Sequence, residues 1–220
     1  MLIVLEGNDG SGKATQANLL VEALREAGKD VQTIDFPRYY DNFFGGFVAE
    51  CLRGEHGDFV DMDPKIASML FAFDRFEAKD QILNWIEAGN IVIADRYTTA
   101  NMVHQGGKIS DDGKQEEFLC WLETLEYDTL GLPRPNMVVY LDVPVEVSLK
   151  NLATKNEGYA AGKKDQHEGD AKFLERSRQA ALRLASQDQA WRIVACAQKG
   201  IMRSRNDIHK EIMQLIHTAS

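Results

Sequence analysis

The chain has 220 residues, of which 44% are hydrophobic and 27% charged, and this ordinary globular composition excludes disordered and fibrous proteins. Its net charge of -9 argues against a protein that coats nucleic acid or an anionic membrane, because both tasks need a basic face. We therefore expect one globular domain over residues 1–220, with neither a nucleic acid polymer nor a membrane as partner.

The three cysteines and the first residues indicate where the protein works. Cys51, Cys120 and Cys196 are odd in number and widely spaced, which predicts reduced thiols in place of disulfides or a zinc site. No apolar stretch approaches the roughly 18 to 20 residues of a membrane helix, and the chain enters an apolar run with no basic segment before it. We expect a cytoplasmic protein.

A strand, a glycine-rich loop and a helix open the chain. Residues 2–6 are a short, β-branched run, and residues 14–28 show apolar residues at helical spacing up to a terminating glycine. Residues 30–36 form the next predicted strand, which Pro37 ends. Asp63 and Pro64 then give the capping signal of a helix predicted over residues 64–88, and a strand follows over 90–95.

The second half continues the alternation of strands and helices. The pattern predicts helices over 112–127, 145–155, 170–186 and near 206–217, with strands over 137–142 and 191–196. Residues 156–169 are small, polar and glycine-containing, and they form a loop long enough to serve as a mobile lid. The alternation predicts an α/β fold, a parallel sheet with helices on both faces.

Residues 7–15, GNDGSGKAT, match the spacing of a phosphate-binding loop between a strand and a helix. The loop N–H groups and the helix N-terminus would bind nucleotide phosphates, and Lys13 would reach the transferred phosphoryl group. Ala14 stands where the motif has the hydroxyl that binds Mg²⁺. Thr15 replaces it poorly, because one residue along a helix turns the side chain by about 100°. We predict an ATP site formed by Gly7, Asn8, Asp9, Gly10, Ser11, Gly12, Lys13, Ala14 and Thr15.

Asp95 ends the strand predicted over residues 90–95, at the edge where open α/β sheets bind their ligands. From this position it could hold Mg²⁺ through water. The alternative is that Asp95 and Arg96 form only a salt bridge at the end of the strand.

Together with FPRYY (36–40), LFAFDRFEA (70–78) and DRYTTANMVHQGG (95–107), these segments resemble the thymidylate kinase family over nearly the whole chain. The resemblance implies a three-layer P-loop NTPase fold with a five-stranded parallel sheet. It also implies phosphorylation of dTMP to dTDP by ATP through direct in-line transfer, with Mg²⁺ as cofactor and a homodimer as the assembly.

The resemblance also implies the site residues. Arg75 and Arg96 fall at the acceptor phosphate, which planar guanidinium groups suit, Phe71 stacks on thymine, and Asn101 and Gln105 meet the base edge. The implied substrate residues are Phe36, Arg38, Tyr39, Phe71, Arg75, Arg96, Asn101, His104, Gln105, Asp165 and Glu168. The implied catalytic residues are Asp9, Lys13, Arg96, Lys163 and Lys164, and the implied Mg²⁺ anchors are Asp9, Asp95 and Glu168.

Three positions depart from common patterns of the family. Ala100 replaces a frequent serine, His104 replaces an aromatic residue, and Gly10 stands beside Asp9 where some members carry an arginine. The missing cation would come from the lid, where Lys163 and Lys164 are the candidates.

Purely structural interpretations of the same residues stay open. Phe71 alone would more often be a core residue, His104 an exposed helix residue, and the lid lysines solvated. Another nucleoside monophosphate kinase or a deoxynucleoside kinase is the alternative enzyme, although two arginines favour a monophosphate acceptor. A nucleotide-binding module without turnover is the alternative outside enzymes.

Overall fold

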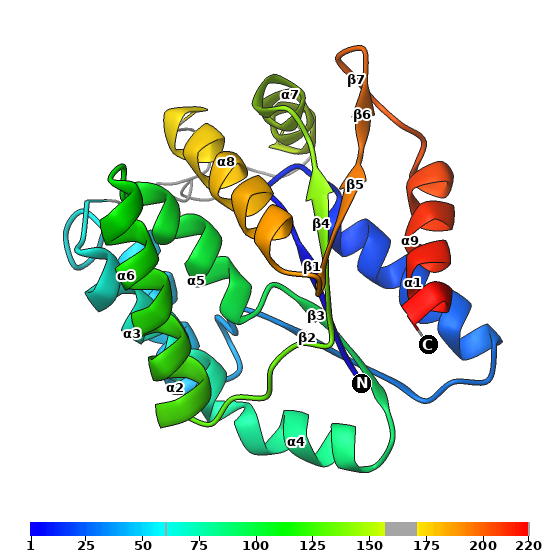
Figure 1. The fold of residues 1–220 in the computed structure, drawn as a ribbon, viewed down its shortest axis with the longest axis horizontal. Helices are drawn as coiled ribbons and strands as arrows, with labels where there is room; N and C mark the ends of the chain where they lie inside the picture. The colour runs from blue at the N-terminus through cyan, green and yellow to red at the C-terminus, as the bar shows by residue number, and fades with distance from the viewer. Residues whose placement is uncertain (60, 157–170, 220) are drawn as a thin grey trace.

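The computed structural model describes residues 1–59, 61–156 and 171–219 (Figure 1). Most of the predicted lid, 156–169, is outside this range. The predictions for Lys163, Lys164, Asp165 and Glu168 therefore lie outside the described residues.

A five-stranded sheet in the order β2-β3-β1-β4-β5, with all pairs parallel, forms the centre of the molecule. This confirms the predicted sheet. The strands are β1 (Leu2–Glu6), β2 (Val31–Asp35), β3 (Ile91–Asp95), β4 (Met137–Asp142) and β5 (Trp191–Ala195). The register pairs Asp35 with Asp95 and Leu5 with Asp95, so the acidic strand ends meet at one edge of the sheet.

Helices cover both faces of the sheet, because its central strands are apolar on both sides. The helices are α1 (Lys13–Glu26), α2 (Phe43–Leu52), α3 (Pro64–Glu77), α4 (Lys79–Glu87), α5 (Thr98–His104), α6 (Asp112–Glu123), α7 (Val145–Asn156), α8 (Ala171–Gln187) and α9 (Arg205–Ala219). Leu20 of α1 and Ile212 of α9 pack in the core of one face. Ile82 of α4, Val103 of α5 and Ala181 of α8 pack in the core of the other. The result is the predicted three-layer fold (Figure 1).

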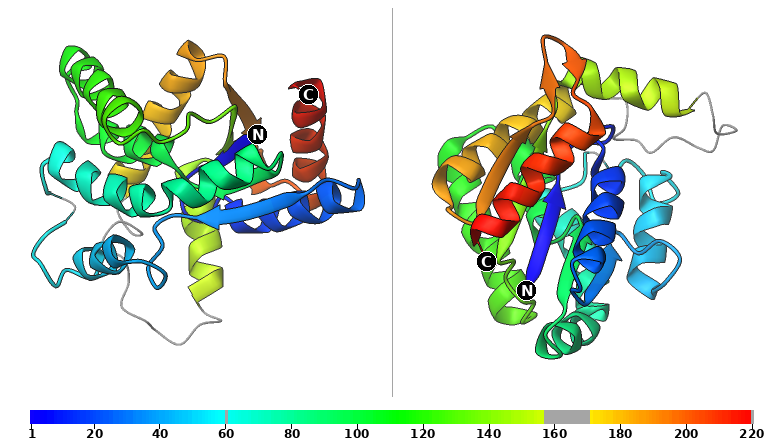
Figure 2. Two further views of the ribbon diagram at one scale, coloured as in Figure 1. Left: turned by 90° about the horizontal axis from the view of Figure 1, so that it is seen from below. Right: turned by 90° about the vertical axis from the view of Figure 1, so that its right-hand side faces the viewer.

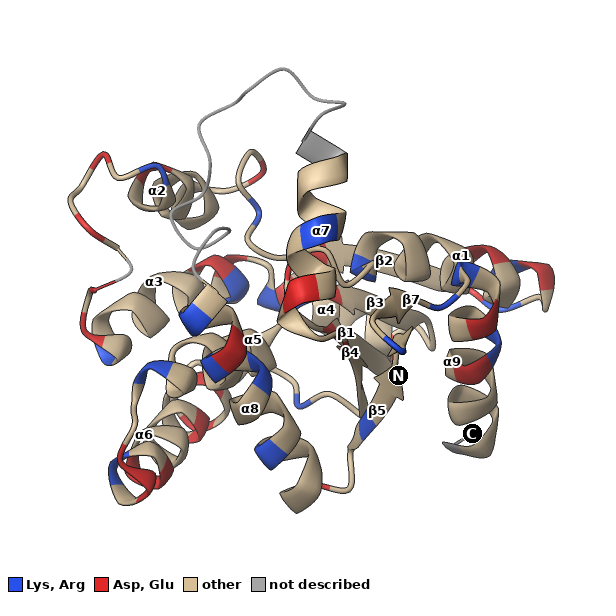
Figure 3. Cartoon of the chain, turned by 90° about the horizontal axis from the view of Figure 1, so that it is seen from above, with Lys and Arg blue, Asp and Glu red and all other residues tan. Residues whose placement is uncertain are grey.

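A further group of helices lies outside the second face. Figure 2 shows α2 and α3 next to each other at the margin of the molecule, beyond the helices that touch the sheet. They enclose a small core of their own around Val48, Phe59 and Ala67. Basic and acidic segments are interspersed over the helices when the molecule is seen from above (Figure 3), so neither sign dominates that side.

The single helix predicted over residues 64–88 is wrong. The structure has two helices, α3 and α4, which meet at the buried Ala78, whose N–H bonds to the carbonyl of Arg75 in a tightened turn. The break lets α4 pack Ile82 on the sheet while α3 follows a different direction. No glycine or proline marks this joint, so the periodicity carried no signal for it.

The helix predicted over 112–127 also ends early, because α6 stops at Glu123 and a π-helical segment, Thr124–Thr129, follows. The prediction also missed α2, α5 and a hairpin of β6 (Ala197–Gln198) and β7 (Ile201–Met202). The hairpin turn, Lys199–Gly200, has positive φ at both residues, a conformation that favours glycine. No helix of the described ranges has the length and apolar character needed to cross a bilayer.

Candidate active site

Two adjoining pockets open at the carboxyl edge of the sheet. We name them the loop pocket, which is lined by residues 9–10, 12–15 and Asp95, and the helix pocket, which is lined by Phe71, Arg75, Asn101 and His104. Five residues line both pockets: Asp9, Phe36, Pro37, Tyr39 and Arg96. Ligands in the two pockets would therefore meet at this shared wall.

The loop that follows β1 is held tightly in place. Lys13 Nζ donates to the carbonyl of Gly7 at 2.8 Å and to that of Asn8 at 3.3 Å, and burial lowers the pKa of the lysine. Gly10 has φ 79°, and a Cβ there would lie 2.5 Å from the carbonyl oxygen of Ser148 in α7. Only glycine fits so close an approach, so α7 fixes the shape of the loop.

The predicted nucleotide residues divide into two sets. Asp9, Gly10, Gly12, Lys13, Ala14 and Thr15 line the loop pocket. Gly7, Asn8 and Ser11 are the buried residues of the loop. Asn8 Nδ2 donates to the carbonyl of Leu174 at 2.9 Å. The second set supports the loop and does not line the pocket.

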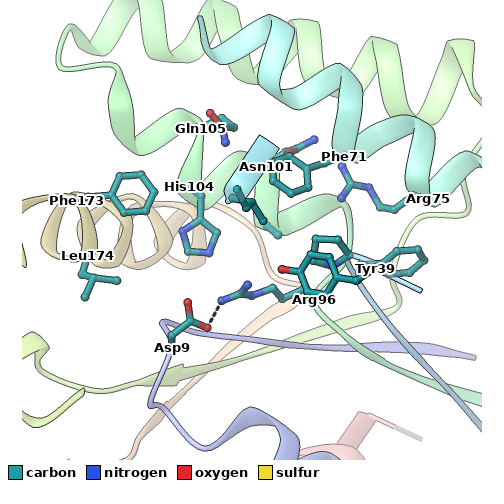
Figure 4. Close-up of a pocket in the computed structure, with 14 residues that line it drawn as sticks. Asp9, Tyr39, Phe71, Arg75, Arg96, Asn101, His104, Gln105, Phe173 and Leu174 are labelled. Atoms are coloured by element: carbon teal, nitrogen blue, oxygen red, sulfur yellow. Dashed lines mark hydrogen bonds and ion pairs between the residues drawn. The ribbon is translucent and has the colours of Figure 1, made fainter. Parts of the chain in front are cut away.

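Asp9 and Arg96 form an ion pair on the shared wall, with 2.6 Å between Oδ1 and Nη2 (Figure 4). Burial opposes ionisation of Asp9, but Arg96 and Lys13 hold its pKa well below the usual range. Arg96 has φ 64°, a left-handed conformation that costs a non-glycine residue about 1–3 kcal/mol. Its buried Nε has no hydrogen-bond partner among the described residues. A strained arginine with an unused donor is suited to bind an anion.

Arg75 lies in the helix pocket near Phe71 and Asn101 (Figure 4). Its Nε and Nη2 donate to both carboxylate oxygens of Glu126 at 2.8 and 2.7 Å. Asn101 Nδ2 donates to the same carboxylate at 2.8 Å and to the carbonyl of Ser68 at 3.1 Å. Arg75 and Arg96 both line the helix pocket, and each is paired with a carboxylate of its own.

Three further predicted residues line the helix pocket. Phe71 packs on Phe59 with 5.7 Å between ring centroids and also faces the pocket, so it is both a core and a pocket residue. The His104 ring stacks on Phe173 at 5.9 Å, and its Nδ1 lies 3.2 Å from Ser177 Oγ, which rules out the exposed alternative. Gln105 is buried, and its Oε1 has no partner within the described ranges.

Among the described residues predicted to bind the substrate, Arg38 is the one that the structure places outside both pockets. Its guanidinium lies 3.4 Å from Gln81 Oε1 and 3.7 Å from Asp41 Oδ2. Its backbone N–H donates to Asp74 at 3.1 Å, and this buried carboxylate also accepts from Asn42 at 2.8 Å. Asp74 thus fixes the segment that carries Tyr39 to the pockets.

Sequence reasoning missed Asp74, Glu126 and Glu6, all buried carboxylates behind the site. Glu6 accepts hydrogen bonds from the Gly7 N–H and from Thr99 Oγ1, each at 3.1 Å, and burial raises its pKa. Asp74 could have been suspected, since it stands beside Arg75 in a quoted motif. Glu126 lies in a stretch with no motif, so no sequence pattern pointed to it.

Comparisons with known proteins identify the family. A family model described as thymidylate kinase matches residues 5–208. A thymidylate kinase of Mycobacterium tuberculosis is 33% identical over 187 residues, which cover 85% of this chain and 86% of that protein. A probable thymidylate kinase of Pyrococcus abyssi is 32% identical over 216 residues, or 97% of this chain and 94% of the relative. The solved thymidylate kinase of Candida albicans matches the fold with a TM-score of 0.74 at 22% identity, covering 99% of this chain and 91% of that one.

Proposed function

The chain belongs to the thymidylate kinase family, which phosphorylates dTMP with ATP, and from this premise we propose how its two pockets divide the reaction. ATP occupies the loop pocket and dTMP the helix pocket. The main support for this proposal is that the two pockets share Asp9 and Arg96 on a common wall, so the reacting phosphates would face each other there. An oxygen of the acceptor phosphate attacks the γ-phosphorus as its bond to ADP breaks, and no covalent enzyme intermediate forms.

Arg96 binds the acceptor phosphate in this proposal. Its unused Nε and its position on the shared wall support the role, and Asp9 holds the guanidinium in place. Lys13 neutralises the transferred phosphoryl group, as expected of a loop lysine that lines the same pocket. Lys163 and Lys164 stay predicted sources of a further cation.

The base lies in the part of the helix pocket lined by Phe71, Arg75 and Asn101, which we name the base end. Phe71 offers a face for stacking, a contact worth about 1–3 kcal/mol per base in nucleic-acid complexes. Both hydrogens of the Asn101 amide are used within the protein, so its oxygen remains to accept a hydrogen bond from a ligand. Glu126 neutralises the charge of Arg75, whose remaining N–H groups can donate to the base. Thymine, which has an N–H beside a carbonyl, matches this arrangement.

Mg²⁺ is the proposed cofactor, and the donor set fits it in part. The described residues contain no cluster of three or more side chains able to hold a metal. Asp95 and Asp9 line the loop pocket, however, and carboxylates that act with nucleotide phosphates and water are the usual Mg²⁺ environment. Asp9 and Asp95 would hold the ion, with Glu168 as a predicted third anchor. When bound, it would neutralise charge on the phosphates.

A homodimer in the cytoplasm is the proposed assembly and location. Ile66, Met69 and Phe76 follow one stripe of α3 and are 55%, 37% and 43% exposed, which supports an interface between copies. The three cysteines are free thiols, as expected in a reducing compartment. Light scattering that gives the mass of one chain at micromolar concentration would contradict the dimer.

A steady-state assay with ATP, Mg²⁺ and a panel of monophosphates tests the proposal. We expect dTMP to have the highest kcat/KM, because the base end matches an imide base and the phosphate end needs a monophosphate. Comparable kcat/KM for dTMP and purine monophosphates would contradict the assignment of the helix pocket.

A further inference from the structure

Glu126 is a buried carboxylate, 1% exposed, that contacts two groups of the helix pocket. Its Oε2 accepts from Arg75 Nε at 2.8 Å, and its Oε1 accepts from Arg75 Nη2 at 2.7 Å and from Asn101 Nδ2 at 2.8 Å. Three donors therefore point at one carboxylate, which suits the ionised form, since a carboxyl proton would have no acceptor. Glu126 itself does not line the pocket.

The amide of Asn101 has two ends of nearly equal shape, an oxygen and an NH₂ group. Behind the side chain lie two acceptors, Glu126 Oε1 and the carbonyl of Ser68. Because neither acceptor can donate a hydrogen, only the NH₂ end can face them. The oxygen end must then serve any ligand, and the pocket offers an acceptor at this point.

Arg75 is oriented by the same carboxylate. The bidentate contact fixes the guanidinium plane and offsets its charge, so the remaining N–H groups act as directed donors. The base end of the pocket therefore presents one acceptor from Asn101 and donors from Arg75. Both polarities depend on Glu126, which is the common partner of the two side chains.

We propose that Glu126 is a positioning residue that makes the pocket select imide bases over cytosine. This inference rests on the proposed placement of the base. Thymine and uracil offer an N3–H donor and an O4 acceptor, which complement Asn101 and Arg75. Cytosine offers an unprotonated N3 and an amino group at the same two points, and both groups are mismatched.

Replacement of Glu126 by glutamine weakens the constraint on Asn101, because the carbonyl of Ser68 is then the one obligate acceptor left of the two. A glutamine NH₂ can donate to the Asn101 oxygen, so the Asn101 amide can turn and present its own NH₂ to the base. We expect the ratio of kcat/KM for dTMP to that for dCMP to fall at least about tenfold in Glu126→Gln, as expected for one reversed buried hydrogen bond. The KM for ATP should stay within about twofold.

Glu123→Gln is the matched control, because Glu123 lies one turn earlier and its side chain pairs, among the described residues, with the exposed Arg134 at 3.4 Å. This variant should keep the wild-type ratio. An equal loss for dTMP and dCMP in Glu126→Gln would show a purely structural role and overturn the inference.

A ligand-side measurement covers the case in which Glu126→Gln does not fold. The wild-type protein should bind 3-methyl-dTMP, which lacks the N3 hydrogen, at least about tenfold more weakly than dTMP. Equal binding of the two would overturn the proposed polarity. A wild-type protein that binds dTMP but does not phosphorylate it would contradict the proposed function and leave this binding comparison valid.

Discussion

The helix pocket contains two arginines, Arg75 and Arg96, each beside a carboxylate. The two ion pairs differ in burial and geometry. The side chains of Arg75 and Glu126 are both 2% exposed and share two hydrogen bonds. Those of Arg96 and Asp9 are 19% and 31% exposed and share one. Two of the five N–H donors of Arg75, including its Nε, are used on Glu126, whereas the Nε of Arg96 has no partner among the described residues.

This difference teaches how one residue type can serve two tasks. A buried arginine that is held by a bidentate carboxylate is neutralised, and it acts through the direction of its remaining N–H groups. An arginine with an unused donor and a strained backbone keeps its capacity to bind an anion. We therefore assign base recognition to Arg75 and phosphate binding to Arg96.

Removal of the phosphate-binding arginine should have the largest effect. Arg96→Ala should lower kcat/KM for dTMP at least about a hundredfold, because each charge-assisted hydrogen bond is worth about 1.5–3 kcal/mol and Asp9 loses the nearer of its two cationic partners. Steady-state kinetics at saturating ATP measures it. A variant with near wild-type kcat/KM would remove Arg96 from the phosphate end.

Loss of the stacking face should have an intermediate effect at the base end. Phe71→Ala should raise the KM for dTMP about tenfold, given about 1–3 kcal/mol for a base–aromatic contact, and change the KM for ATP less. Phe44→Ala is the control, because Phe44 packs on Phe73 and does not line either pocket. Equal increases in both KM values would return Phe71 to a core role.

Substitutions at the proposed metal site should have the smallest effect. They should change the Mg²⁺ concentration that gives half-maximal activity by about three- to tenfold, because phosphates and water supply most Mg²⁺ ligands. Asp95→Asn should raise the Mg²⁺ concentration that gives half-maximal activity. Ala14→Ser, which restores the usual hydroxyl, should lower it or leave it unchanged. If Asp95→Asn titrates like the wild type, Asp95 does not anchor the metal.

The phosphate end could be predicted from sequence far better than the base end. Asp9, Lys13 and Asp95 are found by a loop motif and a strand end, because backbone geometry fixes such residues locally. Glu126 could not be found, since its role depends on a π-helical turn that brings it to Arg75, 51 residues away in sequence. Long-range pairing of this kind leaves no periodic pattern.

The layers of the fold followed from the alternation of strands and helices, but its joints did not. Ala78 interrupts a continuous helical pattern with no glycine or proline, because tertiary packing decides the direction of α4. The helix α2 contains Gly45 and Gly46, which lower its helical propensity, and Asn42 caps it through the Gly45 N–H at 2.7 Å.

The affinity difference between thymidine and dTMP tests the division of labour between the two arginines most directly. Calorimetry gives this difference as a ratio of dissociation constants for the wild type, Arg96→Gln and Arg75→Gln. Because the ratio cancels effects common to both ligands, it isolates the phosphate contribution. We predict that the ratio of the thymidine dissociation constant to the dTMP dissociation constant falls close to one in Arg96→Gln and stays near the wild-type value in Arg75→Gln. A ratio that collapses in Arg75→Gln but survives in Arg96→Gln would contradict it.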